Sequence, residues 1–128
     1  MSDIPVCVVN DGEETRFTNI LCPVDFSEPS KRALYNSILL SRKFQSTLHI
    51  LYVYEPITYI SKRIYSDIDE ENALRYKNAK ALMKEFLKDF DLKGIDHNVK
   101  IKKGIAHEKI LNTIKKEQIT LLIMGTNG

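Results

Sequence analysis

Two short segments far apart in the sequence carry residues that could bind an anionic small molecule. Pro23, Val24 and Asp25 close one apolar run with a carboxylate, and a second apolar run ends in Gly125 and Gly128. A backbone amide beside glycine can approach an anion closely because no Cβ atom stands in the way. An aspartate at a strand end can accept a hydrogen bond from a ligand. The sequence therefore predicts a ligand crevice built from strand ends.

Asp25 also has a purely structural interpretation. The residues Ser27, Glu28 and Pro29 form a typical helix start, with an N-cap hydroxyl, an early acidic residue and a first-turn proline. The Asp25 carboxylate could therefore act as a cap or turn acceptor at the beginning of that helix. Both interpretations place Asp25 at the junction between a strand and a helix.

No group of side chains indicates catalysis or a metal site. Cys7 and Cys22 lie in apolar runs at a spacing that matches no metal motif, and we expect them to be buried, reduced thiols. His49, His97 and His107 are scattered along the sequence without partners at ligand spacing. We predict neither catalytic residues nor metal ligands.

Composition restricts the class of protein. The 128 residues fit one domain, and 43% hydrophobic with 28% charged residues is ordinary for a soluble globular protein. A net charge of +2 is too small to indicate nucleic-acid binding. No apolar stretch is long enough to span a membrane, and the first residues lack the basic start of a secretion signal. We expect a cytoplasmic protein with no nucleic-acid or membrane partner.

Apolar periodicity and turn residues predict strands that alternate with helices. The expected strands are 17–25, 47–54, 98–102 and 119–124, and the expected helices are 28–44, 69–89 and 106–118. Residues 56–70 have no strong period and could be a loop, a lid or the early turns of the next helix. Strand 98–102 alternates polar and apolar residues, which favours a sheet edge, whereas 119–124 is apolar throughout and is expected at the centre.

This alternation predicts an α/β fold with an open parallel sheet and helices on both faces, joined by right-handed crossovers. In such sheets the ligand crevice lies at the carboxyl ends of the strands, where the winding direction reverses. Helical spacing gives the residues expected to face inward, and the aromatic ones among them are expected to be core rather than a base-stacking platform. They are Ala33, Leu34, Ser37, Ile38, Leu40, Phe44, Ala79, Leu82, Met83, Phe86, Leu87, Phe90, Ile110, Leu111 and Ile114.

Three segments, in this order, resemble the universal stress protein family: Ile20 to Glu28, Leu51-Tyr52-Val53, and Leu122 to Gly128. The resemblance covers residues 17–128. It implies a flavodoxin-like, Rossmann-like sheet with strand order 3-2-1-4-5, a role in the stress response, and a homodimer or a tandem-repeat partner domain. In one branch of the family it also implies ATP or a related adenine nucleotide such as AMP, with Mg²⁺ present only alongside the nucleotide.

The resemblance also assigns roles to particular positions. Pro23, Val24 and Asp25 would line the adenine and ribose end of the crevice, and Val53 would present its backbone to the adenine edge. The phosphate loop would begin at the remaining matched positions, which are Met124, Gly125 and Gly128. Slow ATP hydrolysis occurs in some members of the family, so the resemblance leaves weak enzymatic activity open.

The sequence departs from the family pattern after Gly128. Nucleotide-binding members continue with a nine-residue spacer, a Gly-Ser or Gly-Thr pair, a fourth helix and a fifth strand, and none of these follows here. Each lost charge-assisted hydrogen bond to phosphate is worth about 1.5–3 kcal/mol, so we expect weakened nucleotide binding. The alternative is a dimerisation or scaffold domain of the same family that binds no nucleotide.

Residues 1–16 form an amino-terminal extension to the expected domain, which comprises residues 17–128 and lacks its carboxyl-terminal part. Residues 4–9 are apolar and resemble the fifth strand of the family, so the extension could be the tail of a preceding repeat or a relocated strand. We predict that this segment pairs beside 119–124, or with the same strand of a second chain, because an open hydrophobic edge favours aggregation.

Overall fold

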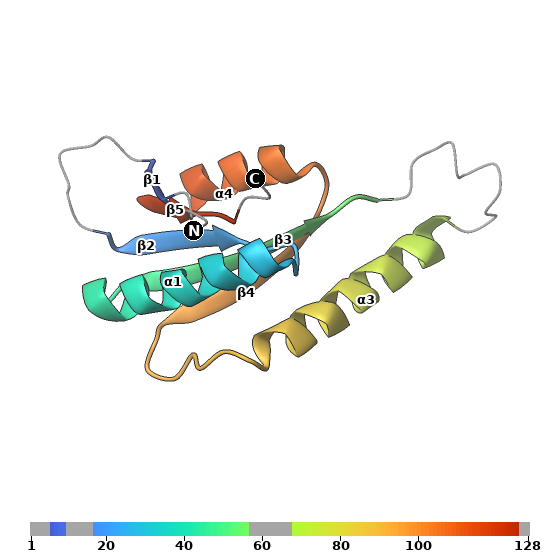
Figure 1. Cartoon of the computed structure of the whole chain (residues 1–128). Helices are drawn as coiled ribbons and strands as arrows, with labels where there is room; N and C mark the ends of the chain where they lie inside the picture. Colours follow the sequence, from blue (N-terminus) through green and yellow to red (C-terminus); the bar gives the residue numbers. More distant parts are fainter. Residues whose placement is uncertain (1–5, 10–16, 57–67, 126–128) are drawn as a thin grey trace.

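The computed structural model describes residues 6–9, 17–56 and 68–125, which form a layered α/β fold (Figure 1). The predicted alternation of strands and helices is confirmed, and the segment 57–67 lies outside the described residues. The elements are β1 (Val6–Val8), β2 (Asn19–Pro23), α1 (Glu28–Phe44), β3 (Thr47–Tyr54), α3 (Ile68–Leu87), β4 (His97–Lys103), α4 (Ala106–Lys116) and β5 (Leu121–Ile123).

The strands form one sheet in the order β1-β5-β2-β3-β4. Strands β2, β3, β4 and β5 are parallel to one another, and β1 pairs with β5 in the antiparallel direction. If β1 is left out and β2 is counted as the first strand, the order read from β4 to β5 is 3-2-1-4. This is the order of a flavodoxin-like sheet, and it confirms the predicted fold class. The expected edge position of β4 and the central position of β5 are also confirmed.

The helices cover both faces of the sheet. Residues of α1 and α3 pack with one set of strand side chains, and α4 packs with the opposite set (Figure 1). The chain proceeds from β2 to β3 to β4 in one direction and then returns to β5 on the other side of β2. The winding direction therefore reverses between β2 and β5, and the crevice expected in such a sheet lies at their carboxyl ends.

The predicted bounds of α1 are correct, and its first turn explains why. Ser27 is the N-cap, and its hydroxyl accepts a hydrogen bond from the Ser30 amide at 3.3 Å. Most of the inward residues expected on α1 are buried, but Phe44 is 38% exposed. It lies in the last turn, where it contacts the Phe17 ring at a centroid distance of 5.0 Å instead of entering the core.

Two leucines expected in the core are exposed. Leu82 on α3 is 53% exposed, and Leu111 on α4 is 56% exposed. On α3 the core contacts come from Ala79, Met83 and Phe86, and Leu82 lies beside a hollow that is described below. Leu111 is one position beyond the inward-facing Ile110, a rotation of about 100° around the helix, which turns it away from the sheet.

Strand β1 covers the free edge of β5, as predicted for the amino-terminal segment. Val6 pairs with Ile123 and Val8 with Leu121, and the Val9 amide donates to the Thr120 carbonyl at 3.2 Å. The prediction that both thiols are buried is correct for Cys22 and wrong for Cys7, which is exposed. Cys7 is exposed because every side chain of the short edge strand β1 is exposed to solvent.

Candidate functional site

A cavity of about 180 Å³ lies at the carboxyl ends of three adjacent strands. It is bounded by the ends of β2, β3 and β5, by the first turns of α1 and by the amino end of α4. This is the position at which the winding direction of the sheet reverses. The lining residues are Pro23, Val24, Asp25, Ser30, Leu51, Tyr52, Val53, Ala106, Ile110, Met124 and Gly125.

Six of the seven residues expected at the binding site line this one cavity. They come from three strand ends that are distant in the sequence: Pro23, Val24, Asp25, Val53, Met124 and Gly125. The seventh, Gly128, lies outside the described residues. The binding roles of these residues remain predictions.

The wall after β2 is fixed by hydrogen bonds. The Val24 amide donates to the Leu51 carbonyl at 2.8 Å, which holds the chain against β3 beyond the end of β2. The Asp25 carboxylate oxygen Oδ1 then accepts from the Ser27 amide at 3.0 Å and from the Ser27 hydroxyl. Asp25 therefore does act as a turn acceptor at the start of α1, while its exposed carboxylate also lines the cavity.

Asp25 carries the negative charge in this cavity at neutral pH. Desolvation raises the pKa of its carboxyl, but the hydrogen bonds from Ser27, Ser30 and the backbone outweigh that effect, and the net pKa lies below the ordinary value of 3.8. An ionised carboxylate is a strong hydrogen-bond acceptor. Asp25 can therefore accept a hydrogen bond from a ligand hydroxyl or amino group.

Phe26 follows Asp25 in a left-handed backbone conformation, with φ of 68°. Such a conformation is uncommon for a bulky residue and is often found at functional sites. Contacts with two other rings hold it, because the Phe26 ring lies 4.5 Å from Tyr52 and 5.3 Å from Phe86, measured between centroids. Phenylalanine has no preference for this conformation, so the turn at Phe26 is not predictable from the residue type.

The β3 wall presents backbone groups rather than a charged side chain. The Leu51 carbonyl accepts from Val24 on the β2 side, and the Tyr54 carbonyl accepts from Gly104 on the opposite side. Because hydrogen-bonding groups alternate sides along a strand, the N–H and C=O of Val53 point toward β2. Strand β2 ends at Pro23, opposite Leu51, so Val53 lies beyond its last paired residue. The wall thus offers a donor and an acceptor from one residue.

The sequence did not indicate three of the lining residues. Ser30 links the turn by accepting from the Asp25 amide at 3.3 Å and donating to the Ser27 carbonyl at 3.2 Å. Ala106 and Ile110 belong to the start of α4, which follows β4 and crosses back to β5. Since a helix after a parallel strand begins at the carboxyl edge of the sheet, the predicted topology could have placed these two residues at the crevice.

The described lining contains no cationic side chain, and Asp25 is its one charged residue. Lys31, which follows soon after Asp25 in the sequence, pairs with Glu28 at 3.4 Å on the surface of α1. Among the described residues there is no group of His, Cys, Asp and Glu suited to hold a metal ion. No helix within the described ranges is long and apolar enough to cross a membrane.

A family model described as the universal stress protein family matches residues 16–128. This chain therefore belongs to the universal stress protein family.

Individual proteins are similar to this chain in sequence or in structure. Universal stress protein MJ0531 of Methanocaldococcus jannaschii is 20% identical over 121 residues, which cover 94% of this chain and 71% of the relative. Universal stress protein UspA from Lactobacillus plantarum is 25% identical with a TM-score of 0.63, over 90% of this chain and 83% of that one. Protein MJ0577 is 24% identical with a TM-score of 0.67, over 82% and 72% of the two chains.

Proposed function

We propose that this chain is a stress-response module that binds an adenine nucleotide, ATP, AMP or a related compound, in the crevice at the ends of β2, β3 and β5. The observation that supports this most directly is the convergence of six expected binding residues on one cavity. The family match supports the stress-response role. A universal stress protein that is 14% identical, with a TM-score of 0.57, has been solved in complex with cAMP, so a protein of this fold can hold an adenine nucleotide.

In this proposal each wall recognises a different part of the nucleotide. The N–H and C=O of Val53 pair with the edge of the adenine ring, which carries both a donor and an acceptor. The ionised Asp25 accepts a hydrogen bond from a ribose hydroxyl. Backbone amides near Gly125 meet the phosphate, with Mg²⁺ present only as a companion of the nucleotide.

The described lining of the crevice contains no cationic side chain that could pair with the phosphates. Most of the binding energy would come from the nucleoside, so AMP and ATP would bind with affinities within about tenfold of each other.

We also propose that the protein acts in the cytoplasm as a homodimer or beside a tandem-repeat domain. Homodimerisation is testable by analytical ultracentrifugation of the chain at several concentrations.

Isothermal titration calorimetry with AMP, ATP and GMP tests the proposal. The informative variant is Asp25→Asn, which removes the charge and keeps the shape of the side chain. Its matched control is Asp89→Asn, the same change in the exposed turn after α3. Loss of one charge-assisted hydrogen bond should weaken AMP binding about tenfold or more.

The control variant should bind AMP as the wild type does, and GMP should bind more weakly than AMP. If the wild type binds no adenine nucleotide, the proposal is wrong, and the alternative of a dimerisation or scaffold domain gains support. Equal binding of AMP by the wild type and Asp25→Asn would contradict the proposed role of Asp25 and would leave nucleotide binding in the crevice supported.

A further inference from the structure

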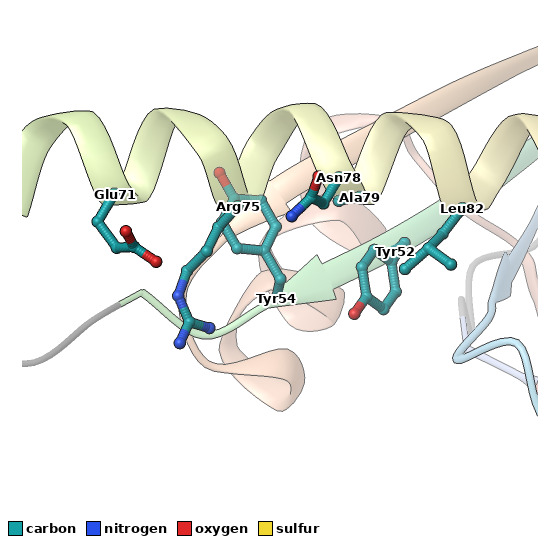
Figure 2. A pocket seen from close by; sticks show the side chains of 7 residues that line it. All are labelled: Tyr52, Tyr54, Glu71, Arg75, Asn78, Ala79 and Leu82. Carbon is teal, nitrogen blue, oxygen red and sulfur yellow. The ribbon is translucent and has the colours of Figure 1, made fainter.

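A second hollow, of about 320 Å³, lies between the end of β3 and the part of α3 from Glu71 to Leu82 (Figure 2). It is lined by two tyrosines of the strand, Tyr52 and Tyr54, and by one face of the helix. The helix residues that line it are Glu71, Arg75, Asn78, Ala79 and Leu82. Its volume is within the usual range of small-molecule sites, which is roughly 300–1,000 Å³.

The helix face above this hollow is polar where a packing face would be apolar. Positions 71, 75, 78, 79 and 82 follow helical spacing and therefore lie on one side of α3. In the carboxyl-terminal half of α3 the inward side carries Met83 and Phe86, which are buried in the core. From Glu71 to Asn78 the positions that line the hollow carry a carboxylate, a guanidinium and an amide, whereas Leu74 is exposed. Packing against the sheet does not explain this arrangement.

Two opposite charges extend into the hollow and do not pair with each other. Glu71 and Arg75 are one helical turn apart, and both side chains extend from α3 toward the end of β3 (Figure 2). Neither forms an ion pair with a described residue. Among the described residues, Arg75 donates one hydrogen bond, from Nη1 to the Glu55 carbonyl at 3.3 Å. A guanidinium group has five N–H donors, so it can also bind a ligand carboxylate.

The remaining walls are aromatic and apolar. The Tyr52 ring is held by Phe26 at a centroid distance of 4.5 Å, and the Tyr54 ring lies 6.5 Å from Tyr76. Leu82 is exposed beside them. Rings that are held in position in this way provide a preformed surface for another planar or branched apolar group.

We propose that this hollow binds a free α-amino acid with an aromatic or large aliphatic side chain. The guanidinium of Arg75 takes the carboxylate, and the carboxylate of Glu71 takes the ammonium group. Side chains at this spacing have Cβ atoms about 5–6 Å apart, so one small zwitterion can bridge them. The apolar body of the ligand then lies against Tyr52, Tyr54 and Leu82. This site is distinct from the nucleotide crevice, although Tyr52 lines both.

Titration of the ¹⁵N-labelled chain with L-phenylalanine tests this proposal, with amide shifts and calorimetry as readouts. Two analogues each lack one charge: 3-phenylpropionate has no ammonium group, and L-phenylalanine amide has no carboxylate. Saturable shifts at Arg75, Asn78 and Tyr54 are expected with L-phenylalanine, and each analogue should bind about tenfold more weakly.

Three variants separate the two charges from general effects. Arg75→Gln should weaken both L-phenylalanine and 3-phenylpropionate, whereas Glu71→Gln should weaken L-phenylalanine alone. Lys77→Gln, on an exposed part of the same helix, should change neither. The proposal fails if the wild type shows no saturable shift at these residues, or if Lys77→Gln weakens binding as much as Arg75→Gln does. Circular dichroism of each variant checks that α3 is still folded.

Discussion

Gly125 lies directly against the backbone of Pro29. A Cβ atom added to Gly125 would be 2.4 Å from both the carbonyl carbon and the carbonyl oxygen of Pro29, and 2.7 Å from the Ser30 amide nitrogen. Only glycine therefore lets the end of β5 reach the first turn of α1. The same contact brings Met124 and Gly125 to the crevice beside Asp25. Gly125 has a packing role that is independent of any ligand.

Substitution Gly125→Ala should therefore affect both stability and binding. The added methyl group forces β5 and α1 apart, and overpacking of this kind costs about 1–3 kcal/mol of unfolding free energy. Urea denaturation measures that cost. Because the shift opens or distorts the crevice, AMP affinity measured by calorimetry should fall in the same variant.

The comparison for Gly125→Ala is Gly94→Ala. Gly94 has φ of +76°, and its nearest neighbour for a Cβ atom is Arg42 at 4.0 Å, in a loop distant from the crevice. Left-handed strain should cost about 1–2 kcal/mol there, with AMP affinity unchanged in the folded protein. Equal loss of AMP affinity in the two variants would show that general destabilisation, and not the contact with Pro29, weakens binding.

Asp25 should contribute to stability in a pH-dependent manner. Its folded pKa is below the ordinary 3.8, so the charged form is favoured in the folded state. The stabilisation is present above pH 3.8 and is lost as the pH falls through the lower folded pKa. Asp25→Asn should thus be less stable than the wild type at pH 7, by at most about 1 kcal/mol because the carboxylate is exposed. Denaturation at pH 7 and pH 3 should show this deficit shrinking at the lower pH.

A buried histidine predicts a second pH effect at the opposite end of the strands. His49 Nε2 lies 3.0 Å from Asn19 Oδ1, and its Nδ1 lies 3.1 Å from Asn98 Nδ2. Desolvation lowers its pKa below 6.5. The nearby Glu117 and Asp96 and the hydrogen bond with Asn98 oppose that effect on the pKa, and Lys100 adds to it. The neutral ring is therefore the form that the folded protein favours.

Because the unfolded chain binds a proton more readily at this site, stability should fall as the pH drops below about 6.5 and through the lower folded pKa. His49→Gln should remove this part of the pH dependence. Stability curves from pH 8 to pH 5 test it, with the exposed His107→Gln as the control. A wild-type decline that His107→Gln removes and His49→Gln retains would refute this assignment.

The pairing of β1 with β5 should depend on one side chain of the amino-terminal segment. Val9 packs with the α4-side cluster, whereas Val8 is 65% exposed. Val9→Asp should destabilise the protein by about 1–3 kcal/mol because a carboxylate would be desolvated. Val8→Asp should stay within about 0.5 kcal/mol of the wild type. Urea denaturation distinguishes them, and a chain without residues 1–10 should aggregate more readily than the full chain.

Much of the fold followed from local signals. The Ser27 cap and Pro29 determine where α1 begins, and apolar periodicity located each strand. Periodicity is less informative about side chains at the border of a buried face, and for that reason it wrongly places Leu82 and Leu111 in the core. The exposure of Cys7 depends on which elements cover β1, a long-range relationship that a short apolar run does not contain.

Most of the residues expected at the crevice could be predicted to lie together, because the carboxyl ends of parallel strands meet at one edge of the sheet. The turn at Phe26 was not, since its conformation is imposed by contacts with Tyr52 and Phe86 from other elements. The hollow beside α3 was also not predictable. It depends on how far α3 lies from the end of β3, which no local pattern encodes.

Mapping AMP onto the ¹⁵N-labelled wild-type chain examines the proposed nucleotide site residue by residue. Titration should shift the amides of Val24, Asp25, Val53 and Gly125 in a single saturable phase, and it should leave Arg75 in the second hollow unchanged. Absence of saturable shifts, or shifts confined to residues outside the cavity at the ends of β2, β3 and β5, would contradict adenine-nucleotide binding in this crevice.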